Sequence, residues 1–352
     1  MQASSGNTAH STSGGQSDPH LVVIANPSAK LLGAEGYAPE QIAANLRSRG
    51  FAVDIYTEDS AEQTVARSEA VAWQGVAAIV ALGGDGTIHS IVEGLLRARQ
   101  AGAAPTVLGI IPAGTMNNVA LALGISESLD SALDVIAAGV SEGMTRTLDV
   151  GLVERNVFVE VSSMGMEAEL LPIGEEVKVR PWELPRAFFI MLQMAQHARP
   201  TRVTLEVDER RTTMRALGVT ICNTPTYGAR FLVAPDAQPD DGQLDVVVFT
   251  GKTGWALLRH LFETMGGKRR SQVDIQRFRG RVVRVRPSHA WAVHMDGTHF
   301  MAVGRGQSSA ALEASAWQAA LTVCAPPKSG DNITPEGPLH TAFRVVPTDH
   351  PR

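Results

Sequence analysis

The hydrophobic pattern in the first part of the chain alternates between short apolar runs and stretches with helical spacing. The run VAAIVAL at residues 76–82 is apolar throughout and predicts a buried parallel strand. After a glycine-rich break, the next apolar side chains have the spacing of one helix face: Ile88, Ile91, Val92, Leu95 and Leu96. The sequence therefore predicts a strand, a tight turn and a helix in succession.

The same alternation extends over residues 20–145. Further strands are predicted at 21–25, 51–57 and 107–111, and helices at 37–49, 60–74 and 126–139. Strands that alternate with helices are typical of a parallel sheet with helices on its faces. We therefore expect an α/β N-terminal domain with a mostly parallel sheet.

The pattern changes near residue 145. Short runs of β type follow, at 147–154, 157–163, 201–207, 214–223, 244–250, 281–287 and 291–295. They predict a mainly antiparallel β-sandwich domain over residues 146–324. One helical stretch, residues 182–197, is rich in Phe and Met. Core packing and the wall of an apolar ligand cleft both explain that composition.

Composition narrows the class of protein. Residues 1–19 are rich in Ser, Gly and Gln, and residues 325–352 in Pro, Thr and other polar residues, so we expect both ends to be disordered. A net charge of -5 argues against a general nucleic-acid binder. The two cysteines, Cys222 and Cys324, have no metal-ligand spacing, which favours a reducing, cytoplasmic compartment. No apolar run approaches the roughly 18 residues of a membrane span, so we expect a soluble or peripheral protein.

The break after the buried strand is the turn Gly83-Gly84-Asp85-Gly86-Thr87. Glycine leaves room for a phosphate, and the N-terminus of the following helix attracts an anion. The carboxylate of Asp85 would repel a bare phosphate, so it suits a partner role to Mg²⁺ or to a water molecule. The plainer interpretation is an ordinary strand-to-helix turn with a solvated Asp85.

Two further polar loops follow predicted strands. Residues 26–30 read Asn-Pro-Ser-Ala-Lys, and residues 112–118 read Pro-Ala-Gly-Thr-Met-Asn-Asn. Ligands of α/β folds bind at the carboxyl ends of the strands. We therefore expect these loops to converge with the glycine turn on one crevice. For Lys30 alone, a solvated position in a turn is the alternative.

Two charged segments lie in the predicted sandwich. Asp240 and Asp241 precede Gly242, where adjacent carboxylates suit a hard cation, although Asp-Asp-Gly is equally good turn chemistry. Residues 268–286 carry eight basic residues and one acid, Asp274. This basic stretch is either a solvated face or a surface that attracts anionic lipid headgroups.

Taken together, the motifs resemble the diacylglycerol kinase catalytic-domain family, which includes bacterial lipid kinases and the sphingosine and ceramide kinases. The resemblance rests on Asn26-Pro27, the GGDGT turn at 83–87, PxGTxN at 112–117, LDVG at 148–151, PDDGxLD at 239–245 and Met295-Asp296-Gly297. GGDGT is shared with NAD kinases, whereas PxGTxN and PDDGxLD together favour the lipid kinases. The resemblance covers residues 21–323.

The resemblance implies a nucleotide crevice between the two domains. By position, the residues that would hold ATP and its phosphates are Asn26, Pro27, Ser28, Thr57, Gly83, Gly84, Asp85, Gly86, Thr87, Gly114, Thr115 and Asn117. Asp240 and Asp241 match an acidic turn that binds a structural Mg²⁺ in some bacterial members. Asp85 is the candidate for organising metal or water in catalysis.

The catalytic base is the weakest part of the resemblance. Bacterial members end the late motif with Asp-Gly-Glu or Asp-Gly-Asp, and its third residue is the proposed base. Here that residue is Thr298, which cannot act as a base at neutral pH. Asp296 is the expected replacement, with His294 and His299 as alternatives. Asn118, where many relatives have Asp, and the loop Asn26-Pro27-Ser28-Ala29, which lacks the usual Ser-Gly ending, are further departures.

The predicted function is an ATP- and Mg²⁺-dependent lipid kinase that acts on a lipid hydroxyl at a membrane surface, with residues 268–286 as the contact. Two alternatives stay open: a nucleotide- or lipid-binding regulator with little catalysis, and a kinase for a soluble NAD-like or polyol substrate. The sequence does not name the lipid. It also leaves the oligomeric state open, a homodimer included.

Overall fold

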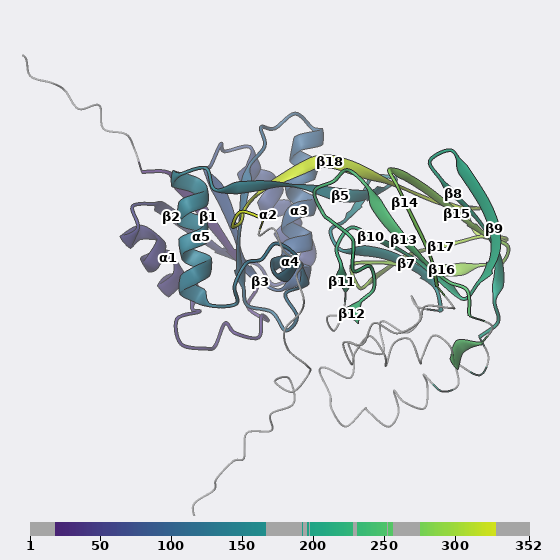
Figure 1. The fold of residues 1–352 in the computed structure, drawn as a ribbon. Helices are drawn as coiled ribbons and strands as arrows, with labels where there is room; N and C mark the ends of the chain where they lie inside the picture. The colour runs from purple at the N-terminus through teal and green to yellow at the C-terminus, as the bar shows by residue number, and fades with distance from the viewer. Residues whose placement is uncertain are drawn as a thin grey trace, which may run out of the picture.

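The computed structural model describes residues 18–166, 198–227, 231–251, 253–255 and 275–328, together with positions 192 and 196. Two halves lie side by side, one of helices around a parallel sheet and one of stacked β-strands (Figure 1). The predicted disordered residues 1–17 and 329–352 lie outside the described residues, as does nearly all of the Phe/Met-rich stretch. In the part of the chain that is described, no helix is long and apolar enough to cross a membrane.

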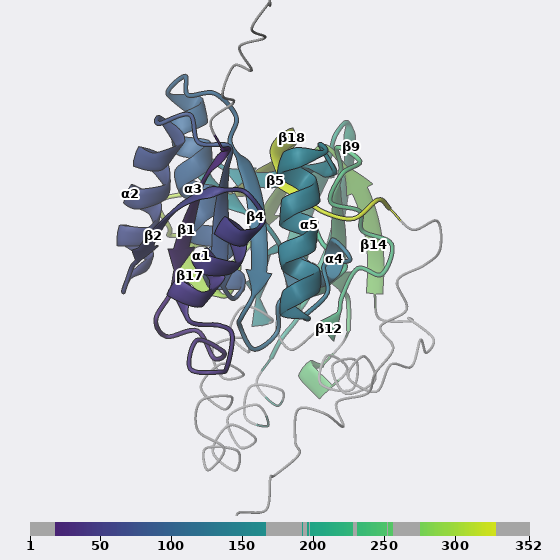
Figure 2. The same cartoon turned by 90° about the vertical axis from the view of Figure 1, so that its left-hand side faces the viewer.

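The first half is built on four parallel strands in the order β2-β1-β3-β4. Its elements are β1 His20–Ala25, α1 Pro39–Ser48, β2 Ala52–Thr57, α2 Ala61–Ala72, β3 Ala78–Gly83, α3 Asp85–Gln100, β4 Val107–Pro112, α4 Asn118–Ala122 and α5 Leu129–Ser141. Helices α2 and α3 cover one face of the sheet and α5 the other (Figure 2). The predicted α/β domain is therefore confirmed.

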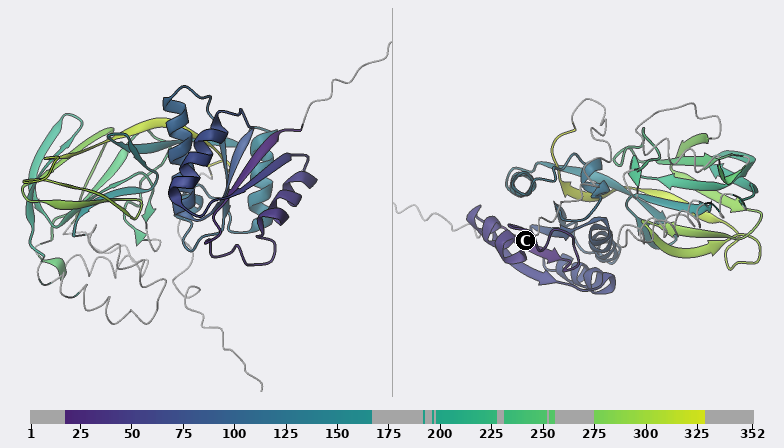
Figure 3. Two further views of the ribbon diagram at one scale, coloured as in Figure 1. Left: turned by 180° about the vertical axis from the view of Figure 1, so that it is seen from behind. Right: turned by 90° about the horizontal axis from the view of Figure 1, so that it is seen from below.

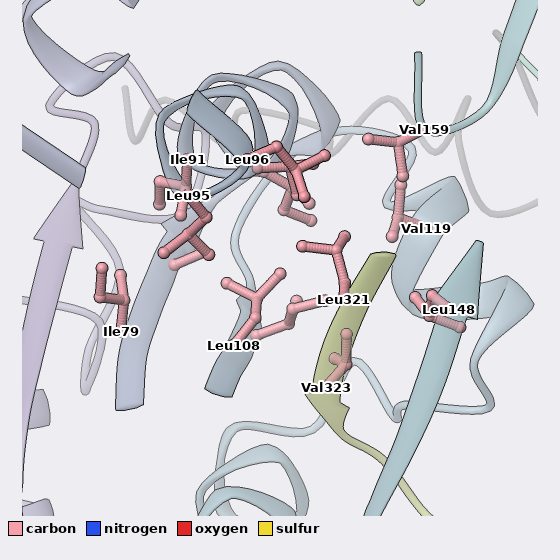
Figure 4. Close-up of a cluster of buried hydrophobic side chains, with 14 of the residues drawn as sticks. Ile79, Ile91, Leu95, Leu96, Leu108, Val119, Leu148, Val159, Leu321 and Val323 are labelled. Carbon is pink, nitrogen blue, oxygen red and sulfur yellow. The ribbon is translucent and has the colours of Figure 1, made fainter. Parts of the chain in front are cut away.

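The central strands are apolar on both sides because both faces of the sheet are covered. In β3, Ile79 and Ala81 pack under α3, whereas Ala78, Val80 and Leu82 pack on the opposite face. The core under α3 extends sideways to Leu148 and to Leu321 and Val323 near the end of the chain (Figure 4). The continuous apolar run at residues 76–82 is thus the sequence signature of a strand buried on two faces.

The second half is a sandwich of two sheets with mainly antiparallel strands (Figure 3). The six-stranded sheet has the order β14-β13-β10-β7-β16-β17. Its strands are β7 Val161–Gly165, β10 Gly218–Cys222, β13 Leu244–Phe249, β14 Ile275–Gly280, β16 Trp291–Met295 and β17 Thr298–Val303. The facing strands are β5 Thr145–Val153, β6 Asn156–Phe158, β8 Thr201–Val207, β9 Arg210–Ala216, β15 Val282–Pro287 and β18 Leu312–Cys324. A short hairpin of β11 Thr226–Tyr227 and β12 Phe231–Leu232 stands apart.

Strand β18 joins the two halves into one sheet. Near its end it pairs in parallel with β4, where Thr322 lies opposite Val107, and over its length it pairs antiparallel with β5 and β15. The ten-stranded sheet therefore runs from β2 to β9 without interruption. The hydrophobic pattern did not reveal β18, because its Ala-rich sequence favours a helix by local propensity and only its partners make it a strand.

Two predicted strands are wrong in detail. Residues 157–163 divide between β6 and β7, which belong to different sheets. Residues 214–223 are not one strand but the end of β9 and the whole of β10, which belong to different sheets. Between them the amide of Leu217 donates to Phe249 O at 2.8 Å, so the chain has already crossed to the second sheet. The positions that face the sandwich core change phase here, from Met214 and Ala216 in β9 to Val219 and Ile221 in β10, so the alternation is interrupted at the crossing.

Candidate active site

The three predicted ligand loops meet at the carboxyl end of the parallel sheet. The amide of Asn26 donates to Leu82 O at 3.2 Å, and the amide of Ala113 donates to Gly83 O at 2.9 Å. The amide of Leu31 in turn donates to Ala113 O at 3.1 Å. The loops after β1, β3 and β4 are therefore hydrogen-bonded to one another, as the sequence predicted from their positions after neighbouring strands.

The glycines of the two central turns touch. A Cβ built on Gly114 would lie 2.4 Å from the Cα of Gly84, and one built on Gly84 would lie 3.0 Å from the Cα of Gly114. Position 114 has no room for a side chain, since real Cβ atoms do not approach backbone that closely, and at position 84 a Cβ would require the neighbouring backbone to shift. The second glycine of GGDGT and the glycine of PAGT are thus needed for the contact between the turns.

Asn117 holds the second turn in shape. Its backbone is left-handed, with φ 53°, a conformation that Asn tolerates better than most residues. The side-chain oxygen accepts from the amide of Gly114 at 3.0 Å, and the side-chain nitrogen donates to Gly114 O at 3.4 Å and to Glu127 Oε1 at 3.5 Å. The buried Asn117 is therefore a clamp on the PAGT turn, with both ends of its amide in use.

Asp85 is the first residue of α3 and links that helix to α4. Its Oδ1 accepts from the amide of Val119 at 3.1 Å. A carboxylate at this place satisfies one of the amides that the start of a helix leaves without an intrahelical partner. Asp85 is partly exposed and carries its negative charge at the meeting point of the two glycine turns.

The other expected nucleotide-binding residues lie at the same edge. Thr57 ends β2 opposite Ala25, and the amide of Ser28 donates to Asn26 Oδ1 at 2.8 Å in a local turn. Thr115 is exposed at the tip of its loop, whereas Thr87 is buried. The edge of the sheet therefore presents exposed polar groups around a rigid centre.

The late motif is the tip of a hairpin. Met295 and Thr298 pair across the turn, and the two residues between them have positive φ, 43° for Asp296 and 84° for Gly297. Two-residue hairpin turns with this geometry favour Asp-Gly. The hairpin β16–β17 thereby carries Asp296 from the sandwich to the helical half.

The carboxylate of Asp296 is fully used. Oδ2 accepts from the amide of Val159 at 2.6 Å, and Oδ1 accepts from the amides of Glu160 and Val161, each at 2.9 Å. The fourth partner is His89 of α3, whose Nδ1 lies 2.8 Å from Oδ2. Asp296, which we expected among the catalytic groups, is at the site but gives its oxygens to three backbone amides and an imidazole.

His89 is the group that the sequence analysis missed. It lies one helical turn after Asp85, so both point along one face of α3. Burial by itself lowers the pKa of His89, but the hydrogen bond and charge of Asp296, together with the charge of Glu93, leave that pKa above its ordinary value. The signal in the sequence that could have identified His89 is its position four residues after Asp85, which places both on one face of the helix.

The two histidines on either side of the Asp296-Gly297 turn, His294 and His299, do not share the position of His89. His294 is buried within β16, on the strand that leads to the turn. The side chain of His299 lies outside the described residues. Thr298 is exposed at the start of β17. Of the imidazoles that the structure describes near the turn, His89 is the one that contacts Asp296 and is also partly exposed, at 24%.

Asn118 connects the helical half to the sandwich. Its side-chain nitrogen donates to Glu160 Oε2 at 3.2 Å, and both residues are buried. An Asp at position 118 would place two carboxylates together there, which is unfavourable when they are buried. Asn118, where many relatives have Asp, is therefore compatible with the neighbouring carboxylate of Glu160. Four contacts therefore form a closed chain. Asp85 of α3 binds α4, and Asn118 of α4 binds Glu160. The amide of Glu160 binds Asp296, which in turn binds His89 of α3.

The acidic turn lies away from this cluster. Asp240 accepts from Arg146 at 2.9 Å and from Lys328 at 2.7 Å, and Asp241 pairs with Arg279. Burial raises the pKa of Asp240, but the hydrogen bonds from Lys328 and Arg146 outweigh it and hold that pKa below its ordinary value. Among the described residues, no group of three or more His, Cys, Asp or Glu could hold a metal ion.

As arranged, the pair does not fit a resident Mg²⁺, because cationic side chains occupy the oxygens that would ligate it. The metal site that the resemblance implied at Asp240 and Asp241 is untested, and the observed ion pairs argue against it. The neighbouring LDVG motif has a structural part: Asp149 accepts from the amides of Gly242 and Ala319 and so fixes both the acidic turn and a bulge in β18.

The described part of the basic stretch, residues 275–286, is not one continuous strand or sheet face. It divides between β14 and β15, which belong to different sheets. Arg279 pairs with Asp241 and Asp245, and Arg284 pairs with Glu313 and Glu206. A cavity of about 420 Å³ lies beside Arg284, and none of the expected site residues lines it.

Comparison with known families agrees with this geometry. Residues 20–153 match the diacylglycerol kinase catalytic domain, and residues 160–314 match the YegS C-terminal NAD kinase β-sandwich-like domain. The helical half of the chain therefore matches the diacylglycerol kinase catalytic-domain family, and the sandwich matches the family of the YegS C-terminal domain. The catalytic domain of the chain is that of a lipid kinase. The two matches are separated by residues 154–159, which contain β6 and end in the segment that binds Asp296.

Individual relatives show the same likeness. The chain is 29% identical to a diacylglycerol kinase of Bacillus subtilis over 224 residues, 63% of this chain and 71% of that one. It is 26% identical to a diacylglycerol kinase of Staphylococcus saprophyticus over 219 residues, 61% and 68% of the two chains. A crystal structure of a diacylglycerol kinase from Bacillus anthracis shares the fold, with TM-score 0.65, 17% identity, and coverage of 88% of this chain and 98% of the other.

Proposed function

We propose that the protein transfers the γ-phosphoryl group of Mg²⁺-bound ATP to the hydroxyl group of a lipid. The observation that carries the proposal is the contact between Gly84 and Gly114, which joins the two glycine turns at the carboxyl end of the parallel sheet. Such an edge, next to the first turn of α3, suits the phosphates of a nucleotide. The family match gives the acceptor class, an alcohol on a lipid.

Different residues of the chain would bind the phosphates, hold the cation and receive the lipid hydroxyl. The backbone of the two turns would hold the phosphates, and Mg²⁺, which enters with ATP, neutralises their charge. The carboxylate of Asp85 stands where these turns meet and organises the bound cation or a water in its shell. The hydroxyl acceptor then approaches from the side of the β16–β17 tip, which brings Asp296 and His89 to the same place.

Asp85 supplies the direct test. Asp85→Asn keeps an oxygen that accepts from the amide of Val119 but removes the negative charge, so we expect an unchanged unfolding temperature. Transfer of labelled phosphate from ATP to lipid should fall by about 10²-fold or more. The assay offers detergent-dispersed diacylglycerol, sphingosine, ceramide and a polyprenol in parallel.

Three results would each contradict part of the proposal. Wild-type rates in Asp85→Asn would remove Asp85 from the site. ATP binding by the wild-type protein without label on any lipid would favour the regulator, and transfer to a soluble alcohol without detergent or vesicles would favour a soluble substrate.

The lipid would be met at a membrane surface. The arginines of the basic stretch that the structure describes are all exposed, but two of them, Arg279 and Arg284, are paired with acids. We therefore expect weaker attraction to anionic vesicles than eight unpaired cations would give. Sedimentation with vesicles of increasing phosphatidylserine content measures this attraction.

A further inference from the structure

The base of the proposed reaction is not at the position where the family pattern puts it. Thr298 cannot take a proton, and Asp296 already accepts two hydrogen bonds on each oxygen. Both oxygens of Asp296 are thus occupied by donors from the protein, which leaves no free position for the hydroxyl of a substrate. The proton of the acceptor hydroxyl therefore needs another group at this site.

We propose that His89, held through Nδ1 by Asp296, is the catalytic base that takes the proton of the lipid hydroxyl on Nε2. An ionised carboxylate can only accept hydrogen bonds, so Nδ1 of His89 is the donor in its 2.8 Å contact with Asp296 Oδ2. That leaves the lone pair of the neutral ring on Nε2, so Asp296 is a positioning residue that fixes the ring and its tautomer.

The surroundings of Nε2 leave it available to a substrate. The His89 side chain is 24% exposed, and Glu93 Oε2 lies 3.9 Å from Nε2, beyond hydrogen-bond distance. The other carboxylate oxygen of Glu93 is bound by Arg97. Among the described residues, Asp85 lies one turn earlier on α3, and Glu160 binds Asp296 through its amide. Helix α4 contributes no titratable side chain.

The step balances without another reactant. The lipid oxygen forms a bond to the γ-phosphorus of ATP while the bond from that phosphorus to the bridging oxygen breaks, and ADP leaves. The hydroxyl proton passes to His89 Nε2, and the imidazolium, facing the Asp296 carboxylate, releases it to solvent in the next cycle. The inference rests on the proposed function, which supplies ATP and the alcohol.

His89→Asn is the sharpest variant, because an Asn side-chain nitrogen can replace Nδ1 as donor to Asp296 while nothing replaces Nε2. We expect kcat to fall by about 10²–10⁴-fold with little change in the KM for ATP. Wild-type activity should fall as pH decreases through the raised pKa of His89, since only the neutral ring accepts a proton. This acid limb should disappear in His89→Asn.

The matched control is His20→Asn. His20 also pairs with an aspartate, with Nε2 3.1 Å from Asp54 Oδ2, but it begins β1 at the opposite end of the sheet from the site. We expect wild-type rates and the wild-type pH profile in this control. In the wild-type protein, the imidazole signal that His89→Asn removes should show the Nδ1–H tautomer by ¹⁵N NMR.

The outcomes separate the two claims. Wild-type kcat and an unchanged acid limb in His89→Asn overturn the assignment of the base and leave the lipid kinase standing, and so does an Nε2–H tautomer. A wild-type protein that labels no lipid overturns the proposed function and, with it, the reaction that His89 would serve.

Discussion

At the scale of single residues, the site depends on two glycines, Gly84 and Gly114, that have no side chain. The two turns approach so closely at Gly84 and Gly114 that a methyl group on either would meet backbone atoms. Protein interiors tolerate such overlap poorly, because backbone cannot move aside as the end of a long side chain can. The glycines therefore fix the distance between the loops after β3 and β4.

We expect Gly114→Ala to separate these loops. Its Cβ would lie 2.4 Å from Gly84 Cα and 2.9 Å from Asn117 Oδ1, so the cost should be about 1–3 kcal/mol of stability. ATP affinity should fall at least about tenfold, the equivalent of 1.4 kcal/mol. Urea unfolding and calorimetric titration with ATP measure the two effects. Gly33→Ala, with nothing within 4 Å of the added Cβ, is the control and should leave both unchanged.

At the scale of elements, the β16–β17 hairpin and helix α3 together make the site from distant parts of the chain. The hairpin belongs to the sandwich, yet its tip binds the amides of 159–161 and His89. The same sheet carries Asp245 on β13, opposite Arg279 of β14. Burial and the charge of Asp236 raise the pKa of Asp245 to about 6, although Arg277 acts in the opposite direction.

This raised pKa predicts how stability depends on pH. Between about pH 4 and 6 the folded protein holds a proton on Asp245 that the unfolded chain has lost, so this group makes the protein less stable as pH rises through that range. Asp245→Asn should be more stable than wild type at pH 7, by about 1–3 kcal/mol. The difference should shrink as pH falls to about 4. Urea unfolding at several pH values measures it, and a constant difference would contradict the raised pKa.

At the scale of the whole molecule, one sheet connects both halves, and the acidic turn stands where they join. Asp149 of β5 binds the turn at Gly242 and β18 at Ala319, while Arg146 of β5 and Lys328 after β18 bind Asp240. The charges of the turn are thus balanced from within the chain. Removing one partner of a largely buried ion pair costs more than removing an exposed one.

Metal removal tests this account. We expect dialysis against EDTA to leave the unfolding temperature unchanged, because Arg146, Lys328 and Arg279 take the place of a cation. Arg146→Met should cost about 2 kcal/mol or more, and added Mg²⁺ should restore part of the loss. The control Arg211→Met removes an exposed partner of Glu206 and should cost less than about 1 kcal/mol. A wild-type protein that EDTA destabilises and Mg²⁺ restores would instead have a resident metal.

The sequence by itself determined the elements whose pattern is local. The buried run of β3, the glycine turn and the amphipathic α3 were readable because strand and helix periods and turn chemistry act over a few residues. The loops after β1 and β4 could be placed beside that turn, since parallel strands share one carboxyl edge. These features led to the family and to Asp85.

Only the tertiary structure decided the rest. Strand β18 is a strand because β4, β5 and β15 pair with it, against the helical propensity of its alanines. His89 acquires its chemical character from Asp296, 207 positions away, and Asp240 finds its cations 94 and 88 positions away. A local sequence pattern cannot predict such pairs, because burial and contacts between distant parts of the chain set the charge state and orientation of each group.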